Sequence, residues 1–148
     1  MTRSTAREIA VQLCFELEFQ PDDPQSFLDE RLTTEHFALL REELDLYSDR
    51  PSGKQMAYIR AVVLGVREHL EELDETIARY AEGWSVGRIS SIARAVLRVA
   101  IYECRYVEDV PTGVAINEAV RILKDYEDED VVGFVNGILG SVAREENQ

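Results

Sequence analysis

One stretch of the chain repeats apolar residues at alternating spacings of three and four over 25 residues. Its members are Met56, Ile59, Val63, Val66, Leu70, Leu73, Ile77 and Tyr80. This spacing places all of them on one face of an α-helix. Two alternatives follow: a dimeric coiled coil, or a long helix or kinked helix pair packed inside its own bundle. The second is favoured because the run covers only about three and a half heptads and lacks evident pairing of flanking charges.

Helical periodicity recurs along the rest of the chain, and the alternation typical of strands persists nowhere. We expect a first helix that starts at Thr5 with a capping box and ends before Pro21, then one or two short helices within 22–52. A helix that is apolar around most of its circumference begins near Ile89 and should be central to the core. After Pro111, a helix capped by Thr112 and a last helix opened by the acidic run 127–130 complete the pattern.

These segments predict an all-α fold. We expect a compact single-domain helical bundle of about six to seven helices over residues 1–148, since this length is typical of one domain.

The charge of the chain restricts where nucleic acid could bind. Lys and Arg number 16 against 29 Asp and Glu, so the formal net charge is −13. Only residues 1–15 and 82–107 carry net positive charge, +1 and +2. Any contact with nucleic acid must therefore concentrate there or be shared with a basic partner.

The arginines are open to two interpretations. Arg94, Arg98 and Arg105 share one helical stripe, and we favour a solvated edge at which they pair with the abundant carboxylates. Arg3 and Arg7 flank the start of the first helix, where we expect them to be exposed and able to contact phosphate oxygens.

Residues for catalysis or metal binding do not converge in the sequence. His36 and His69 lack the spacing of zinc ligands, and no phosphate-binding glycine motif or nucleophile motif occurs. Cys14 lies on the apolar stripe of the first helix and forms no CxxC pair with Cys104. We expect no catalytic activity, no metal and no cofactor. Without a signal sequence or a membrane-spanning apolar run, the expected location is cytoplasmic.

Three motifs cover nearly the whole chain. They are AREIAVQL at 6–13, RAVLRVAIYE at 94–103, and VPTGVAINEAVRILKDY at 110–126 followed by FVNGIL at 134–139. In this order they resemble the NusB family of transcription antitermination factors. The resemblance implies a compact all-helical RNA-binding protein without catalytic activity.

The resemblance also implies partners. Such proteins bind the boxA element of ribosomal RNA leader transcripts together with NusE, a small-subunit ribosomal protein. They do so within an antitermination complex on RNA polymerase that contains other Nus factors. No membrane contact is implied, and whether the isolated protein forms a homodimer is left open.

Matching the motifs residue by residue assigns two sets of contacts. The RNA-binding set is Arg3, Arg7, Gln12, Asp130 and Phe134. The partner-binding set is Phe15, Arg88 and Arg94. A Phe ring can stack on an unpaired base, and an Asp can accept a hydrogen bond from an exocyclic amino group. Core packing remains an equal alternative for Phe134. The competing function is a helical protein-interaction module that binds NusE with little RNA affinity of its own, which the negative charge favours.

Overall fold

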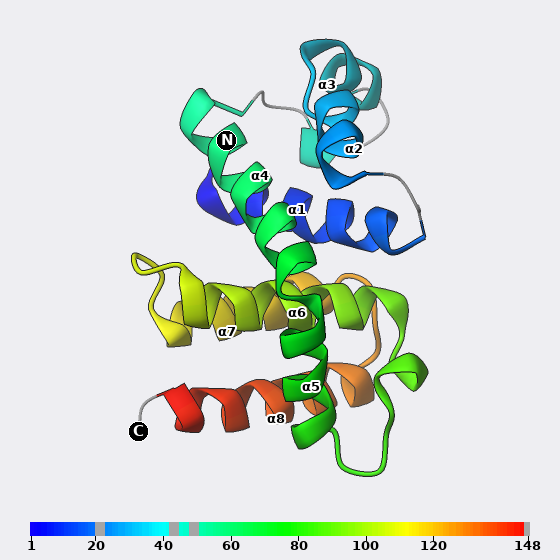
Figure 1. The fold of residues 1–148 in the computed structure, drawn as a ribbon, viewed down its shortest axis with the longest axis vertical. Coiled ribbons are helices and arrows are strands. Elements are labelled where there is room, and N and C mark those ends of the chain that lie inside the picture. The colour runs from blue at the N-terminus through cyan, green and yellow to red at the C-terminus, as the bar shows by residue number, and fades with distance from the viewer. Residues whose placement is uncertain (20–22, 42–44, 48–50, 147–148) are drawn as a thin grey trace. The chain divides into compact units, whose positions relative to one another are not determined.

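The computed structural model describes residues 1–19, 23–41, 45–47 and 51–146, and these contain helices and no strand. The helices are α1 (Arg3–Glu18), α2 (Pro24–Arg31), α3 (Thr34–Arg41), η1 (Asp45–Tyr47), α4 (Gly53–Glu68), α5 (Leu70–Tyr80), η2 (Val86–Arg88), α6 (Ser91–Tyr106), α7 (Thr112–Leu123) and α8 (Glu129–Glu146) (Figure 1). The predicted all-α class is confirmed. Within these ranges α-helices number eight rather than six to seven, because the 56–80 run divides in two and the segment before it forms two helices.

The contacts between Cα atoms divide the chain into two compact units, residues 1–67 and 68–148. The single domain over 1–148 stays a prediction. No helix in the described ranges is long and apolar enough to cross a membrane.

The first unit begins with a helix that starts earlier than expected. The Thr2 hydroxyl accepts a hydrogen bond from the Thr5 amide at 3.1 Å, so Thr2 is the N-cap of α1. The expected start at Thr5 was therefore wrong, because a suitable cap lies three residues upstream. The helix ends at Glu18 with Phe19 as its C-cap, and Pro21 lies outside the described residues.

Arginines connect the helices of the first unit. Arg60 on α4 donates to Asp29 on α2 at 2.8 Å and to Gln25 at 3.2 Å. Arg31 on α2 donates to Glu16 on α1 at 3.1 Å. Buried apolar side chains contribute most of the folding stability of the unit, since exposed ion pairs contribute little. The buried set includes Ile9, Leu13, Leu17, Phe27, Leu28, Phe37, Ile59 and Val63.

The 56–80 stripe forms a helix pair that is interrupted at His69, where α4 ends and α5 begins. Ile59 and Val63 on α4 and Leu73 and Ile77 on α5 are fully buried within this single chain. The interpretation as a helix pair is confirmed.

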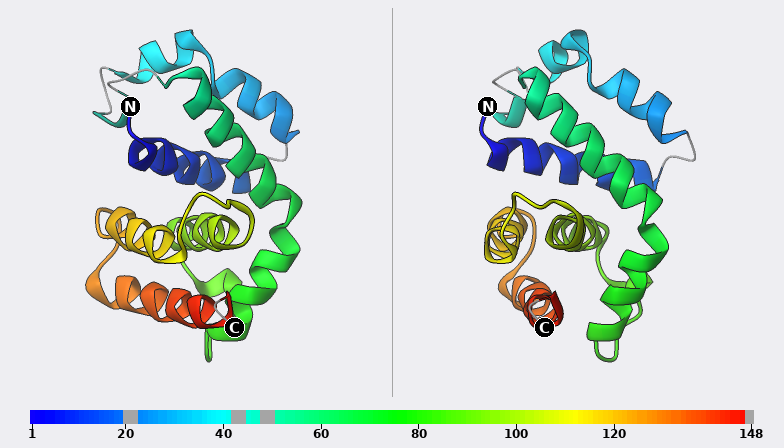
Figure 2. Two further views of the ribbon diagram at one scale, coloured as in Figure 1. Left: turned by 90° about the vertical axis from the view of Figure 1, so that its left-hand side faces the viewer. Right: turned by 60° about the vertical axis from the view of Figure 1, so that its left-hand side comes forward.

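The second unit is built around α6, which packs against α5, α7 and α8. Figure 2 shows α6, α7 and α8 lying side by side. The Ser90 hydroxyl caps α6 by accepting from the Ala93 amide at 3.3 Å. Seven consecutive residues of α6, 95–101, are buried, so the predicted central helix is confirmed.

The starts of α7 and α8 differ in chemistry. Pro111 is the N-cap residue of α7 and no side chain caps that helix, so the expected Thr112 cap was wrong. Thr112 is instead the first helical residue, because the extended backbone of Pro111 (φ −62°, ψ 145°) makes that proline the flanking N-cap residue. Asp128 caps α8 by accepting from the Val131 amide at 3.0 Å.

The arginines of α6 pair with carboxylates, as expected for Arg98 and Arg105. Arg98 donates both Nε and Nη2 to the carboxylate of Asp74 on α5, at 2.8 and 2.9 Å. Arg98 is only 7% exposed, so its predicted place at a solvated edge was wrong. The bidentate ion pair with Asp74 stabilises this guanidinium, because burying a charged group without a partner would cost free energy.

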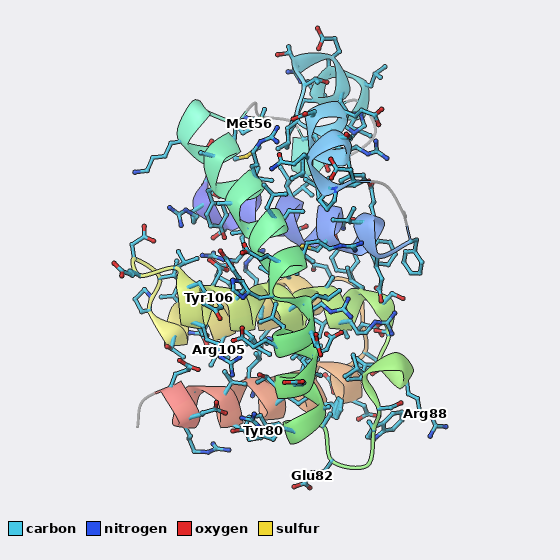
Figure 3. The ribbon with its side chains drawn as sticks, viewed as in Figure 1. Met56, Tyr80, Glu82, Arg88, Arg105 and Tyr106 are labelled. Atoms are coloured by element: carbon cyan, nitrogen blue, oxygen red, sulfur yellow. The ribbon has the colours of Figure 1, made fainter. Side chains whose placement is uncertain are left out.

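Arg105 forms a second group of ion pairs at the other end of α6. It donates to Glu72, Glu145 and Glu146 at 3.2, 3.4 and 3.0 Å and so joins α5, α6 and α8. Figure 3 shows Arg105 between α6 and α8, with Tyr106 on the same helix. The Tyr106 hydroxyl donates to Glu72, and this hydrogen bond lowers the pKa of the Glu72 carboxyl.

We expect Asp74→Ala to lower the free energy of unfolding by about 2–4 kcal/mol, because it removes the bidentate partner of a buried guanidinium. Arg79→Ala is the matched control, since the Arg79 side chain is 56% exposed and solvent screens its ion pair with Glu145, so its loss should change stability little. Urea unfolding followed by circular dichroism measures both. Equal losses in the two variants would contradict a special role for the Asp74–Arg98 pair.

Candidate nucleic-acid interface

A surface pocket of about 310 Å³ lies in the second unit, between the segment that precedes α6 and the first turns of α8. Its lining residues are Trp84, Arg88, Ile89, Ser90, Asp130, Val131 and Phe134. Asp130 and Phe134 are four residues apart on α8 and therefore share one face. The structure thus brings together three residues that the sequence singled out, Arg88, Asp130 and Phe134.

Two aromatic rings form the apolar part of the pocket. The ring centroids of Trp84 and Phe134 are 6.1 Å apart, and their planes are inclined at 53°. Trp84 is 52% exposed and Phe134 is half-buried, so both rings are accessible to a ligand. Of the two alternatives for Phe134, full burial in the core does not occur, whereas its neighbours Val132 and Val135 on α8 are buried. Such rings offer flat apolar faces on which a planar ligand can stack.

The segment that carries Trp84 and Arg88 is held by the backbone and by one arginine. Gly83 has a φ of +78°, a left-handed conformation that favours glycine, and it turns the chain just before Trp84. Arg94 on α6 donates to the carbonyl groups of Val86 (3.4 Å) and Ile89. Arg94 is therefore a positioning residue for this segment, and its partner contact stays a prediction.

Charged groups lie at the rim of the pocket. The guanidinium of Arg88 lies 5.8 Å from the Trp84 ring centroid, and Figure 3 shows Arg88 at the outer edge of the molecule's second unit. Asp130 is exposed, and Asp128 rather than Asp130 caps α8. Within the part of the chain that the structure describes, no hydrogen bond or ion pair engages the Asp130 carboxylate. That carboxylate can therefore accept hydrogen bonds from a ligand.

The remaining RNA-binding candidates lie on α1 in the first unit, and one of them differs from expectation. Arg7 is only 3% exposed, so the prediction that it is exposed was wrong. It shares the helical stripe of Ala10, Cys14 and Leu17, all buried, and this position turns it inward. Arg3 is half-buried, with its guanidinium 4.2 Å above the ring of Tyr58.

Gln12 and Phe15 lie on another face of α1. Both are partly exposed, and the Phe15 ring packs edge-on against Phe19 at 5.4 Å. Phe19 is 61% exposed, which extends this aromatic surface. Arg3 lies nine residues before Gln12 and therefore about half a turn around the helix from it. One face of α1 thus carries Gln12 and Phe15 without Arg3.

The sequence did not mark Trp84 as a site residue, because Trp84 lies outside the three family motifs. The available signal was the position of the only tryptophan of the chain, directly after a glycine and four residues before Arg88. An exposed aromatic residue in a loop is a better indicator of a binding surface than an aromatic residue in a helical stripe.

Among the described residues, no group of three His, Cys, Asp or Glu side chains is placed to hold a metal ion. Burial raises the pKa of the Cys104 thiol to about 11, so this group is protonated at neutral pH and is a poor nucleophile.

Aromatic rings, arginine side chains and groups that hydrogen-bond base edges are among the features with which proteins bind unpaired bases of RNA. Together with the fold, they define the class as a small all-α protein with a surface suited to RNA. The model of the NusB family matches residues 4–144, and the chain belongs to this family.

Individual relatives agree with this assignment. The transcription antitermination protein NusB of Symbiobacterium thermophilum is 42% identical over 144 residues, which cover 97% of this chain and 90% of that protein. The protein of the same name from Natranaerobius thermophilus is 34% identical over 148 residues, covering 100% and 99%.

Solved structures show the same fold. NusB of T. maritima matches with a TM-score of 0.76 at 34% identity, covering 98% of this chain and 92% of that one. A crystal structure of the antitermination factors NusB and NusE in complex with dsRNA matches with a TM-score of 0.75, covering 97% and 96%. Its identity of 21% supports the likeness of fold alone.

We expect Arg94→Ala to loosen the segment that carries Trp84, because the carbonyl groups of that segment lose their donor. The steady-state fluorescence anisotropy of the single tryptophan should fall while the far-ultraviolet circular dichroism stays unchanged. Arg144→Ala is the control, since Arg144 donates to Ser141 on its own helix. An unchanged anisotropy in Arg94→Ala would show that the segment holds its place without the arginine.

Proposed function

We propose that this protein is a non-catalytic RNA-binding transcription antitermination factor of the cytoplasm. It binds boxA RNA of ribosomal RNA leader transcripts together with NusE, inside an antitermination complex on RNA polymerase. Membership of the NusB family supports the class. The observation that carries the RNA-binding role is the pocket in which Asp130 and Phe134 meet Trp84 and Arg88.

The RNA contacts divide between two chemistries. Phe134 supplies a ring on which a base stacks, and Asp130 accepts from base edges, which gives discrimination rather than affinity. Arg3 and Gln12 on α1 contact the backbone of the RNA. Arg7 acts on RNA through the fold of α1, because its side chain is almost fully buried.

The partner supplies much of the positive charge. A protein with a net charge of −13 repels phosphate over most of its surface, so a basic partner such as NusE strengthens RNA binding. Phe15, Arg88 and Arg94 are the residues assigned to this partner. The residues 1–148 act together as one domain in this complex.

The second candidate function is a protein-interaction module with little affinity for RNA. The pairing of Arg98 and Arg105 with carboxylates supports it, because these two cations are already neutralised. RNA titration separates the two functions.

We expect the protein alone to bind labelled boxA RNA weakly, and NusE to tighten binding at least about tenfold, or ~1.4 kcal/mol. Fluorescence anisotropy at one salt concentration, with and without NusE, measures the difference. A scrambled RNA of equal length is the control. If NusE binds the protein but RNA affinity does not change, the interaction module is the correct function.

The two arginines at the start of α1 should behave differently. Arg3→Ala should reduce the slope of log affinity against log salt by about 0.7, the contribution of one phosphate contact on a single strand. Arg7→Ala should instead lower the free energy of unfolding by about 2 kcal/mol, because it removes a buried side chain. Arg67→Ala, an exposed arginine on α4, should change neither. An unchanged salt slope in Arg3→Ala would exclude Arg3 from the interface.

A further inference from the structure

We propose that the pocket of the second unit binds one unstacked guanine of the RNA, with Trp84 as a base-stacking residue and Asp130 as the residue that selects guanine. This inference rests on the proposed function, since it names the base that the RNA-binding surface takes. It adds Trp84 to the contacts and assigns a base preference to the pocket.

Stacking is the first part of the inference. The centroids of the Trp84 and Phe134 rings lie 6.1 Å apart, so the rings contact each other and a base stacks on the outer face of one of them rather than between them. Parallel and edge-to-face contacts are both favourable between aromatic groups. Ile89 and Val131 complete the apolar lining, which excludes water from the faces of the base. An aliphatic ligand would not use a ring face in this way.

Hydrogen bonding is the second part. A carboxylate only accepts hydrogen bonds, and its two oxygens suit two adjacent N–H donors. Guanine presents two adjacent donors on its Watson–Crick edge, whereas adenine and cytosine present an amino group beside a ring nitrogen that is an acceptor. Uracil presents a single ring N–H between two carbonyl groups. Asp130 is therefore complementary to guanine and repels part of the same edge in the other three bases.

Arg88 at the rim of the pocket supplies the positive charge that attracts the RNA phosphate, which the Asp130 carboxylate repels. Arg88 lies in the stretch 82–107, which carries net positive charge, and its guanidinium lies beside the Trp84 ring. An arginine can form a bidentate contact with a phosphate oxygen pair. A nucleotide whose base occupies the pocket can thus place its phosphate near Arg88, which offsets the repulsion from Asp130.

Trp84 is the only tryptophan, so its fluorescence reports on the pocket directly. The experiment titrates the full chain with the pentamers UUGUU, UUAUU, UUCUU and UUUUU at low salt and follows quenching of Trp84. We expect UUGUU to bind about tenfold tighter than UUUUU, the ratio that one bidentate base contact provides. The pentamers with adenine and cytosine should lie closer to UUUUU.

Two variants separate stacking from selection. Asp130→Asn should remove most of the guanine preference. The preference is measured as the ratio of the affinities for UUGUU and UUUUU, so the effect of the lost charge, which is the same for both RNAs, cancels. Asp125→Asn, an exposed carboxylate outside the pocket, is its control. Trp84→Leu, measured by anisotropy of labelled RNA, should weaken UUGUU about tenfold. Tyr126→Leu is its control, because Tyr126 is 41% exposed and does not line the pocket.

The outcomes are distinct. The inference would be overturned by equal affinities for the four pentamers, or by a guanine preference that survives in Asp130→Asn. In either case, binding of boxA RNA with NusE would still support the proposed function. Loss of boxA binding in the unmodified protein would overturn both. Circular dichroism of each variant confirms that its helices are retained.

Discussion

The second unit depends on the burial of α6. This helix is apolar around most of its circumference, so it can be stable only when α5, α7 and α8 cover it. Arg98 and Glu103 are the charged residues on its buried surface, and Asp74 of α5 accepts both donors of Arg98. The pair fixes the rotation of α5 relative to α6, because a buried guanidinium tolerates no other arrangement without loss of its hydrogen bonds.

The pocket follows from this arrangement. Ser90 caps α6 and Arg94 on its first turn binds the preceding carbonyl groups, so the start of α6 determines where Trp84 and Arg88 lie. The packing of α8 on α6 then places Asp130 and Phe134 opposite them. Residues 84–90 and 130–134 are far apart in sequence, and a rigid helix pair brings them together. Side chains that the helices already hold in place lose less conformational entropy when RNA binds, so the entropic cost of binding is lower.

Most of the fold was predictable. The 3.6-residue period identified the helices, and the 56–80 run divided as one of the two interpretations proposed. Apart from the number of helices, the errors in the fold concerned helix ends, such as Thr2 instead of Thr5 as the cap of α1 and Pro111 instead of Thr112 before α7. These errors arise because several neighbouring residues can cap a helix, and the choice among them depends on hydrogen bonds that packing selects.

Sequence alone determined the all-α class and the family, and it singled out Arg88, Asp130 and Phe134 as candidates. Period and motif are properties of consecutive residues, so a single chain displays them. Only the tertiary structure decided that Arg7 is buried, that Asp128 rather than Asp130 caps α8, and that the Trp84 ring lies beside the Phe134 ring. Exposure and proximity depend on which helices cover which faces, and that information lies in contacts between distant residues rather than in local spacing.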